Sequence, residues 1–142
     1  MPPDLFAWAD ALRRAHFPPE RNKLSAHVTL FHAFAPSLYE ELRRVLVRFA
    51  ADFAPPRARV SGLMNLGGGT AIALESPALI AIHAAIAEHF HGALTVQDSH
   101  ALRPHITVQN KVTPREAREL QATLAETLEP RQFRFAGLGL HI

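Results

Sequence analysis

Apolar side chains at helical spacing mark two stretches in the first third of the chain. Residues 4–16 and 38–53 each carry such a stripe, which predicts two amphipathic helices. Ser37 followed by Glu40 has the pattern of a capping box at the start of the second helix. The stretch between the two helices, residues 24–32, is predicted to form a strand.

The rest of the chain continues this mixture of strand and helix patterns. Thr113, Pro114 and Glu116 supply an N-cap, a proline at the first helical position and a capping glutamate. The other expected elements are strands at 57–64 and 70–74 joined as a hairpin, a helix over 79–90 that ends by Gly92, a strand over 104–112, a helix over 114–128, and a strand over 133–142 with a bulge near Gly137.

Two segments repeat the same pattern 78 residues apart. His27-Val28-Thr29-Leu30 matches His105-Ile106-Thr107-Val108, and the helices that follow align as well. With nine histidines and seven threonines, chance alone gives about 0.4 His-x-Thr pairs, so the aligned flanks carry most of the specificity. Two long copies predict a domain with two related lobes rather than a solenoid.

Strand parity places each histidine with its threonine. On a strand His27 and Thr29 share one face, while Val28 and Leu30 point to the other, and the second motif behaves in the same way. Two imidazoles that face one another can take a proton from an attacking oxygen and give one to a leaving oxygen. The threonine hydroxyls can donate to non-bridging phosphate oxygens.

Parity adds further candidates on the second strand and one on the first. If that strand is regular, Arg103, Gln109 and Lys111 share the face of the motif, and Arg103 or Lys111 can hold a phosphate. Pro104 weakens this inference for Arg103, because proline fits only a strand start, an edge or a bulge. Phe31 shares the face of the first motif and is a candidate for stacking on a base, although core packing is the commoner role of a strand aromatic.

Composition bounds the remaining possibilities. A chain of 142 residues that is 48% hydrophobic fits one domain, residues 1–142. The absence of cysteine excludes thiol nucleophiles, thiolate zinc sites and disulfides. The net charge is +2, and neither a membrane-spanning run nor a signal peptide is visible, so a cytoplasmic protein without a membrane partner is expected.

Other histidines and glycines invite alternative interpretations. A histidine-rich set lacks a recognisable spacing with a carboxylate, so no metal site and no cofactor is predicted from it; its members are His32, His83, His89, His91 and His100. Gly67-Gly68-Gly69 lacks the lysine and the following helix of a phosphate-binding loop and is interpreted as a hairpin turn.

The paired motifs and their helices resemble those of the two-histidine (2H) phosphoesterase superfamily, and within it the 2′-5′ RNA ligase or LigT-like cyclic phosphodiesterase branch. The resemblance covers residues 22–140. It implies a bilobal, pseudo-twofold α+β fold in which antiparallel sheets line a central cleft and helices pack outside. It also implies metal-independent cleavage of 2′,3′-cyclic or related nucleotide and RNA-end phosphodiesters, with 2′-5′ RNA ligation as a reverse activity. His27 and His105 are then catalytic, and Thr29 and Thr107 bind phosphate.

The start of the chain departs from that family pattern. Family members usually place a strand before the first helix, whereas this chain begins almost directly in the helix at Asp4. The exposed sheet edge that results predicts a homodimer.

Two other functions compete with the phosphodiesterase. They are a non-catalytic RNA- or nucleotide-binding module that keeps the cleft, and a metal-dependent hydrolase.

Overall fold

The computed structural model of the chain describes residues 3–17, 26–135, 137, 138 and 140. Helices and strands are mixed along these residues, with two short 3₁₀ turns between them. In chain order the elements are α1 (Pro3–His16), η2 (Pro36–Leu38), α2 (Tyr39–Asp52), β1 (Arg57–Asn65), β2 (Thr70–Glu75), α3 (Pro77–His89), η3 (Gln97–Ser99), β3 (His105–Gln109), α4 (Pro114–Thr127) and β4 (Gln132–Arg134).

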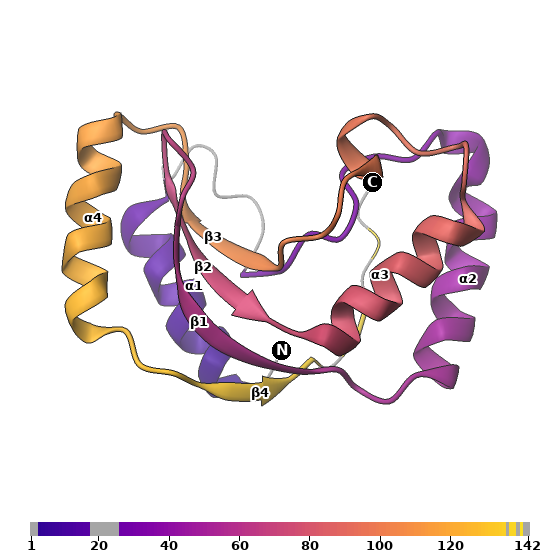
Figure 1. Cartoon of the computed structure of the whole chain (residues 1–142), viewed down its shortest axis with the longest axis horizontal. Helices are drawn as coiled ribbons and strands as arrows, with labels where there is room; N and C mark the ends of the chain where they lie inside the picture. Colours follow the sequence, from indigo (N-terminus) through magenta and orange to yellow (C-terminus); the bar gives the residue numbers. More distant parts are fainter. Residues whose placement is uncertain (1–2, 18–25, 136, 139, 141–142) are drawn as a thin grey trace.

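The four strands form one curled antiparallel sheet with the order β3-β2-β1-β4. α1 and α4 lie outside this sheet at one end of the molecule, and α2 and α3 lie at the other end (Figure 1). The register of β1 and β2 shifts between Val60 and Gly62, and that of β2 and β3 shifts between Thr70 and Ala71. Such bulges increase the local twist of a strand, which fits the curl of the sheet.

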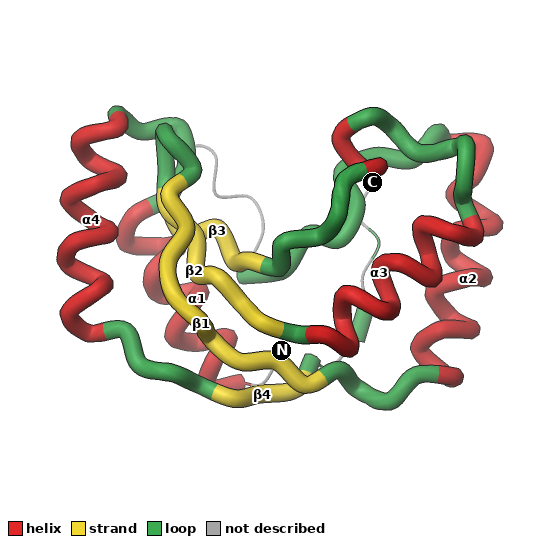
Figure 2. The backbone as a smooth tube through the Cα atoms, viewed as in Figure 1, coloured by secondary structure: helices red, strands yellow, loops and turns green. Residues whose placement is uncertain are grey.

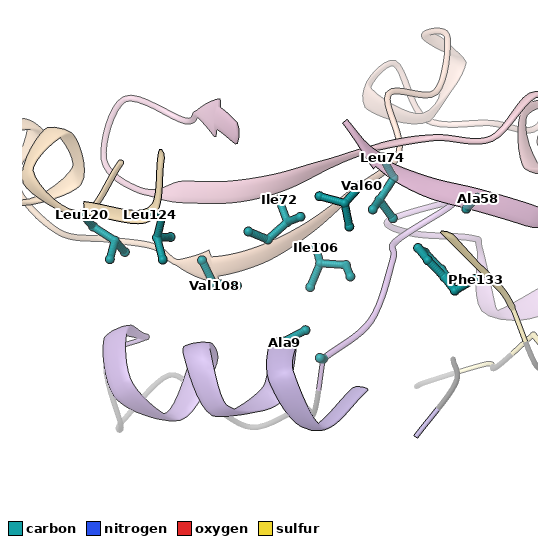
Figure 3. Packing of buried hydrophobic residues seen from close by; sticks show 11 residues of the cluster. Ala9, Ala58, Val60, Ile72, Leu74, Ile106, Val108, Leu120, Leu124 and Phe133 are labelled. Carbon is teal, nitrogen blue, oxygen red and sulfur yellow. The ribbon is translucent and has the colours of Figure 1, made fainter. Parts of the chain in front are cut away.

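One face of the sheet packs on α1 and α4. Alternate strand positions turn inward, so that Val60, Ile72 and Ile106 lie in one cluster with Ala9 of α1. Figure 3 shows these side chains between the sheet and the helix, with Leu120 and Leu124 of α4 beside Val108. At about 25 cal/mol per Å² of buried apolar area, this cluster is a major source of stability for the sheet.

A second hydrophobic cluster joins α2 to α3. Leu42 and Val45 of α2 pack with Ile82 and Ile86 of α3 and with Phe90. The described residues therefore form two hydrophobic clusters, one beneath the sheet and one between two helices. The expected α+β class, with antiparallel strands and outer helices, is confirmed.

The helices and the hairpin agree with the sequence prediction. The start of α4 is capped as expected, since Thr113 Oγ1 accepts a hydrogen bond from the Glu116 backbone N–H at 3.2 Å and Pro114 occupies the first turn. The glycine turn joins β1 to β2, and Gly67 adopts a φ of 84°, a left-handed conformation that glycine reaches without a Cβ penalty.

The predicted strand at 24–32 is wrong for residues 26–32, which run as an irregular segment (Figure 2). Two of its backbone N–H groups donate to carboxylates. Ala26 N–H donates to Asp10 Oδ1 at 3.1 Å, and His32 N–H donates to Asp98 Oδ1 at 2.8 Å. Residues 24 and 25 lie outside the described part of the chain.

Two other predictions need correction. Ser37 does not cap α2, because it lies inside η2. The N-cap position of α2 is Leu38, and no side-chain hydrogen bond caps the helix there. The last strand is much shorter than 133–142: β4 covers Gln132–Arg134, and the described residues after it, including Gly137, are not in a strand. Residues 136, 139, 141 and 142 lie outside the described part of the chain. None of the described helices is long and apolar enough to cross a membrane.

Candidate active site

The second motif lies on β3 with the expected alternation. Ile106 and Val108 are fully buried in the core, and His105 and Thr107 are half-buried on the opposite face of the sheet. His105 pairs with Ala73, which in turn pairs with Gly62 of β1. These neighbours are small, and a Cβ added at Gly62 would meet no heavy atom within 4 Å beyond its chain neighbours.

A backbone hydrogen bond fixes the tautomer of His105. Its Nδ1 lies 2.6 Å from the carbonyl oxygen of Arg103. Because a carbonyl oxygen only accepts, Nδ1 must donate, and the neutral ring then carries its lone pair on Nε2. His105 is thus held with Nε2 as the atom that can accept a proton, or donate one when the ring is charged.

The first motif sits on the irregular segment and still shows alternation. Ala26 is buried, and Val28 packs against the same core as Ile106 and Val108. His27 and Thr29 occupy the alternate positions and are half-buried. The two motifs therefore lie over one shared core, although only the second motif is on a strand.

One turn of α1 holds the backbones of both motifs. Asp10 accepts from the N–H of Ala26, the residue before His27, and Arg13 Nη1 donates to the carbonyl oxygen of Thr107 at 2.7 Å. Residues three apart on a helix share one face, so the two motif segments meet adjacent positions of the same helix. We call Asp10 and Arg13 the α1 clamp.

The guanidinium of the α1 clamp is buried. Arg13 is 3% exposed, and burial lowers the pKa of its guanidinium while the charge of Asp10 opposes this shift. Arg13 also stacks on the ring of Phe17 at 4.3 Å from the ring centroid. A charge is rarely buried in this way unless it has partners to satisfy, and here a partner is the backbone of the second motif.

A second carboxylate anchors the far end of the first segment. Asp98 is 4% exposed and accepts hydrogen bonds from the backbone N–H groups of His32 and Ala33 and from His32 Nδ1 at 2.9 Å. Burial raises the pKa of Asp98, but these hydrogen bonds outweigh burial and hold the pKa below its ordinary value of 3.8. Asp98 therefore accepts these hydrogen bonds as an ionised carboxylate.

The anchor predicts a pH-dependent loss of stability. Because the folded pKa of Asp98 lies below the unfolded value, its contribution is present above about pH 4 and is lost as the pH falls through the folded pKa. We expect Asp98→Asn to lower the free energy of unfolding at pH 7 by about 1–3 kcal/mol and to flatten its decline below pH 4. Urea unfolding across pH 2–7 measures both effects.

The matched control for this prediction is Asp52→Asn. Asp52 is an exposed acid at the end of α2. This variant should keep the stability and the acid decline of the wild type. An Asp98→Asn protein with an unchanged decline below pH 4 would show that the anchor does not set the acid stability.

The shared face predicted for Gln109 and Lys111 is wrong. The register shift beside Thr70 turns Gln109 inward, where it is 5% exposed and its Oε1 accepts from Thr70 Oγ1 at 3.0 Å. β3 ends at Gln109, and Lys111 lies beyond it, exposed and with a φ of 57°. Phosphate binding by Lys111 thus loses its parity argument and stays an untested prediction.

Phe31 lies in the second core rather than in open space. Its ring stacks on His83 at 4.5 Å between centroids, with 9° between the ring planes, and packs near Phe34. Burial lowers the pKa of His83, opposed by a hydrogen bond to the Leu30 backbone and by the charge of Asp98. Since one face of Phe31 is occupied by His83, base stacking stays a prediction for its other face.

His32 and His89 each contact a different carboxylate. His89 contacts Glu41 at 3.0 Å, and His32 contacts Asp98. Among the residues that the structure describes, no group of three or more histidine or acidic side chains is arranged to hold a metal ion.

The sequence model of the 2′-5′ RNA ligase superfamily matches residues 1–142. The chain belongs to this superfamily. A comparison with curated proteins finds no match. Membership indicates an enzyme of the phosphoesterase or ligase type, with RNA or a nucleotide as its substrate.

Three residues that bond to the backbone of the motif segments have no recognisable sequence signature. Asp10 and Arg13 were part of an amphipathic helix, and Asp98 was part of a loop, so none carried a motif. A usable signal was the position of Arg13, four residues after the core residue Ala9 and therefore on the buried face of the helix. A charged residue on a core-facing stripe calls for a specific partner.

Proposed function

We propose that this protein is a metal-independent phosphodiesterase of 2′,3′-cyclic or related nucleotide and RNA-end phosphodiesters, with His27 and His105 as its acid–base pair. The observation that carries the proposal is the α1 clamp, which holds both His-x-Thr segments of a chain that matches the superfamily over its full length. The same site can support 2′-5′ RNA ligation if an RNA 5′-hydroxyl, in place of water, attacks the cyclic phosphate and the ribose 3′-oxygen leaves. The enzyme needs no cofactor in this scheme.

The proposed chemistry uses two proton transfers at one phosphorus. One imidazole takes the proton of an attacking water as the new phosphorus–oxygen bond forms. The other gives a proton to the ribose oxygen that leaves as the ring bond breaks. Thr29 and Thr107 donate hydrogen bonds to the non-bridging oxygens, where negative charge grows in the transition state. Arg103 holds the same phosphate by charge.

The fixed tautomer of His105 supports its part in this scheme. Because Nδ1 donates a hydrogen bond to the Arg103 carbonyl oxygen, the proton exchanged with substrate is on Nε2. The ring does not have to reorient between steps. Such preorganisation avoids a cost that a free side chain would meet.

The test is hydrolysis of nucleoside 2′,3′-cyclic phosphates in excess EDTA. We expect turnover of at least one of the four nucleosides, unchanged by the chelator, with a bell-shaped dependence of kcat/KM on pH. The position of the phosphate in the product, 2′ or 3′, identifies the bond that breaks. A protein that binds these compounds without turnover would be a binding module, and activity lost with EDTA and restored by a metal would favour a metal-dependent hydrolase.

A further inference from the structure

A set of arginines shares the polar face of the sheet with His105. Arg59 of β1 lies opposite Glu75 of β2 and opposite Gln132 of β4. Glu75 is two residues from Ala73, the partner of His105, so the Arg59 row lies about 7 Å farther along the same face. The arginines start one row away from the catalytic imidazole.

The next row brings two positive charges together. Arg57 of β1 and Arg134 of β4 are directly opposite each other across the strand pair, and both are exposed. Like charges at such positions destabilise a sheet. Arg59 forms an ion pair with Glu75, but none of the ion pairs in the described ranges involves Arg57 or Arg134. A bound anion would relieve their repulsion.

The two rows line a surface hollow of about 420 Å³. Its wall includes Arg57, Arg59, Arg134, Glu75, Gln132 and Pro77. Arginine binds phosphate oxygens through its planar fork of N–H donors, and Gln132 adds an uncharged donor. The hollow therefore offers donors and net positive charge on the same face of the sheet as His105.

We infer that Arg57 and Arg134 bind the phosphate backbone of a single-stranded oligonucleotide whose end reacts at His105. This inference rests on the proposed function and narrows it: the substrate is an RNA oligomer with a terminal cyclic phosphate, rather than a free mononucleotide. Phosphates farther along the strand reach the arginine rows, while the terminal phosphodiester occupies the space beside His105, Ala73 and Gly62.

The experiment measures binding of 5′-fluorescein oligoadenylates of one to eight nucleotides, each ending in a 3′-phosphate, by fluorescence polarisation. The test variant is the double substitution Arg57→Gln/Arg134→Gln. The control is Arg43→Gln/Arg44→Gln, which removes the same charge from α2, where the two side chains are 71% and 68% exposed. Binding is repeated from 50 to 300 mM salt, and turnover of a nucleoside 2′,3′-cyclic phosphate is measured in parallel.

Affinity of the wild type should rise with length over the first few nucleotides. The test variant should lose about 20-fold in affinity for the long oligomers at 0.1 M salt, and the slope of log K against log salt should fall by about 1.4, as two lost phosphate contacts imply. The control variant should match the wild type within two-fold.

Equal affinity in the test variant and the control would overturn the inference. A glutamate-rich peptide that displaces the labelled oligomer as well as an unlabelled oligomer does would also overturn it, in favour of an acidic protein partner. The two proposals fail in different ways. Arginine-dependent binding without turnover rejects the phosphodiesterase and keeps the subsite, whereas turnover with arginine-independent binding keeps the phosphodiesterase and rejects the subsite.

Discussion

Replacing either His27 or His105 with alanine is expected to lower turnover of a nucleoside 2′,3′-cyclic phosphate by at least about 1,000-fold. General acid–base catalysis by one positioned group contributes about 10²–10⁴-fold, and the two transfers depend on each other, so the losses will not add in the double variant. KM should change by much less than kcat, because phosphate binding is assigned to the threonines and Arg103. Steady-state kinetics of both variants in EDTA measure this.

The matched control is His91→Ala, since His91 is an exposed histidine just after α3. It should retain wild-type kinetics. Each active-site variant should also lose one limb of the bell-shaped pH profile in its residual activity, and the lost limb identifies the acid and the base. Full activity in either His27→Ala or His105→Ala would reject the two-histidine mechanism.

Local patterns sufficed for the helices and the hairpin because their cause is local. The Thr113 cap, the glycine turn and the 3.6-residue stripes act within a few residues of the element they shape. The segment at 26–32 is different. Its sequence alternates as a strand does, but its N–H partners are Asp10 and Asp98, which lie 16 and 66 residues away from the residues they contact. Single-sequence patterns do not contain such contacts.

In the candidate site, too, the features set by local sequence were predicted and those set by distant contacts were not. The two His-x-Thr pairs are visible in the sequence because the motif occurs twice with aligned flanks. The placement of His105 and Thr107 opposite Ile106 and Val108 follows from strand parity. Parity failed at Gln109, because it assumes a regular strand and a bulge lies between Thr107 and Gln109. The arginine rows were invisible for another reason: only the register of β1 with β4 brings Arg57 to Arg134.

Arg13→Met is expected to lower kcat by about 10- to 100-fold and to leave KM within about three-fold. The guanidinium of Arg13 donates to the Thr107 carbonyl and so fixes the strand that carries His105 and Thr107. A displacement of about 1 Å at a reacting group can cost about 100-fold in rate, while binding of the phosphate is less sensitive to it. Arg13 acts here as a positioning residue, since it donates to the backbone of the second motif. Steady-state kinetics with the best cyclic phosphate, together with thermal unfolding, measure the effect.

Two further variants separate positioning from a general loss of structure. Arg14→Met removes the neighbouring arginine, whose side chain is 68% exposed, and should leave both kinetics and stability near the wild type. Arg13→Lys keeps a cationic N–H donor for the Thr107 carbonyl and should recover most of the kcat lost in Arg13→Met. If Arg13→Met caused only a loss of stability, it would lower the melting temperature. Its kcat would then equal the wild-type value at temperatures where all variants are folded. A folded Arg13→Met protein with wild-type kcat, or one that changes KM alone, would show that the α1 clamp does not position the second motif.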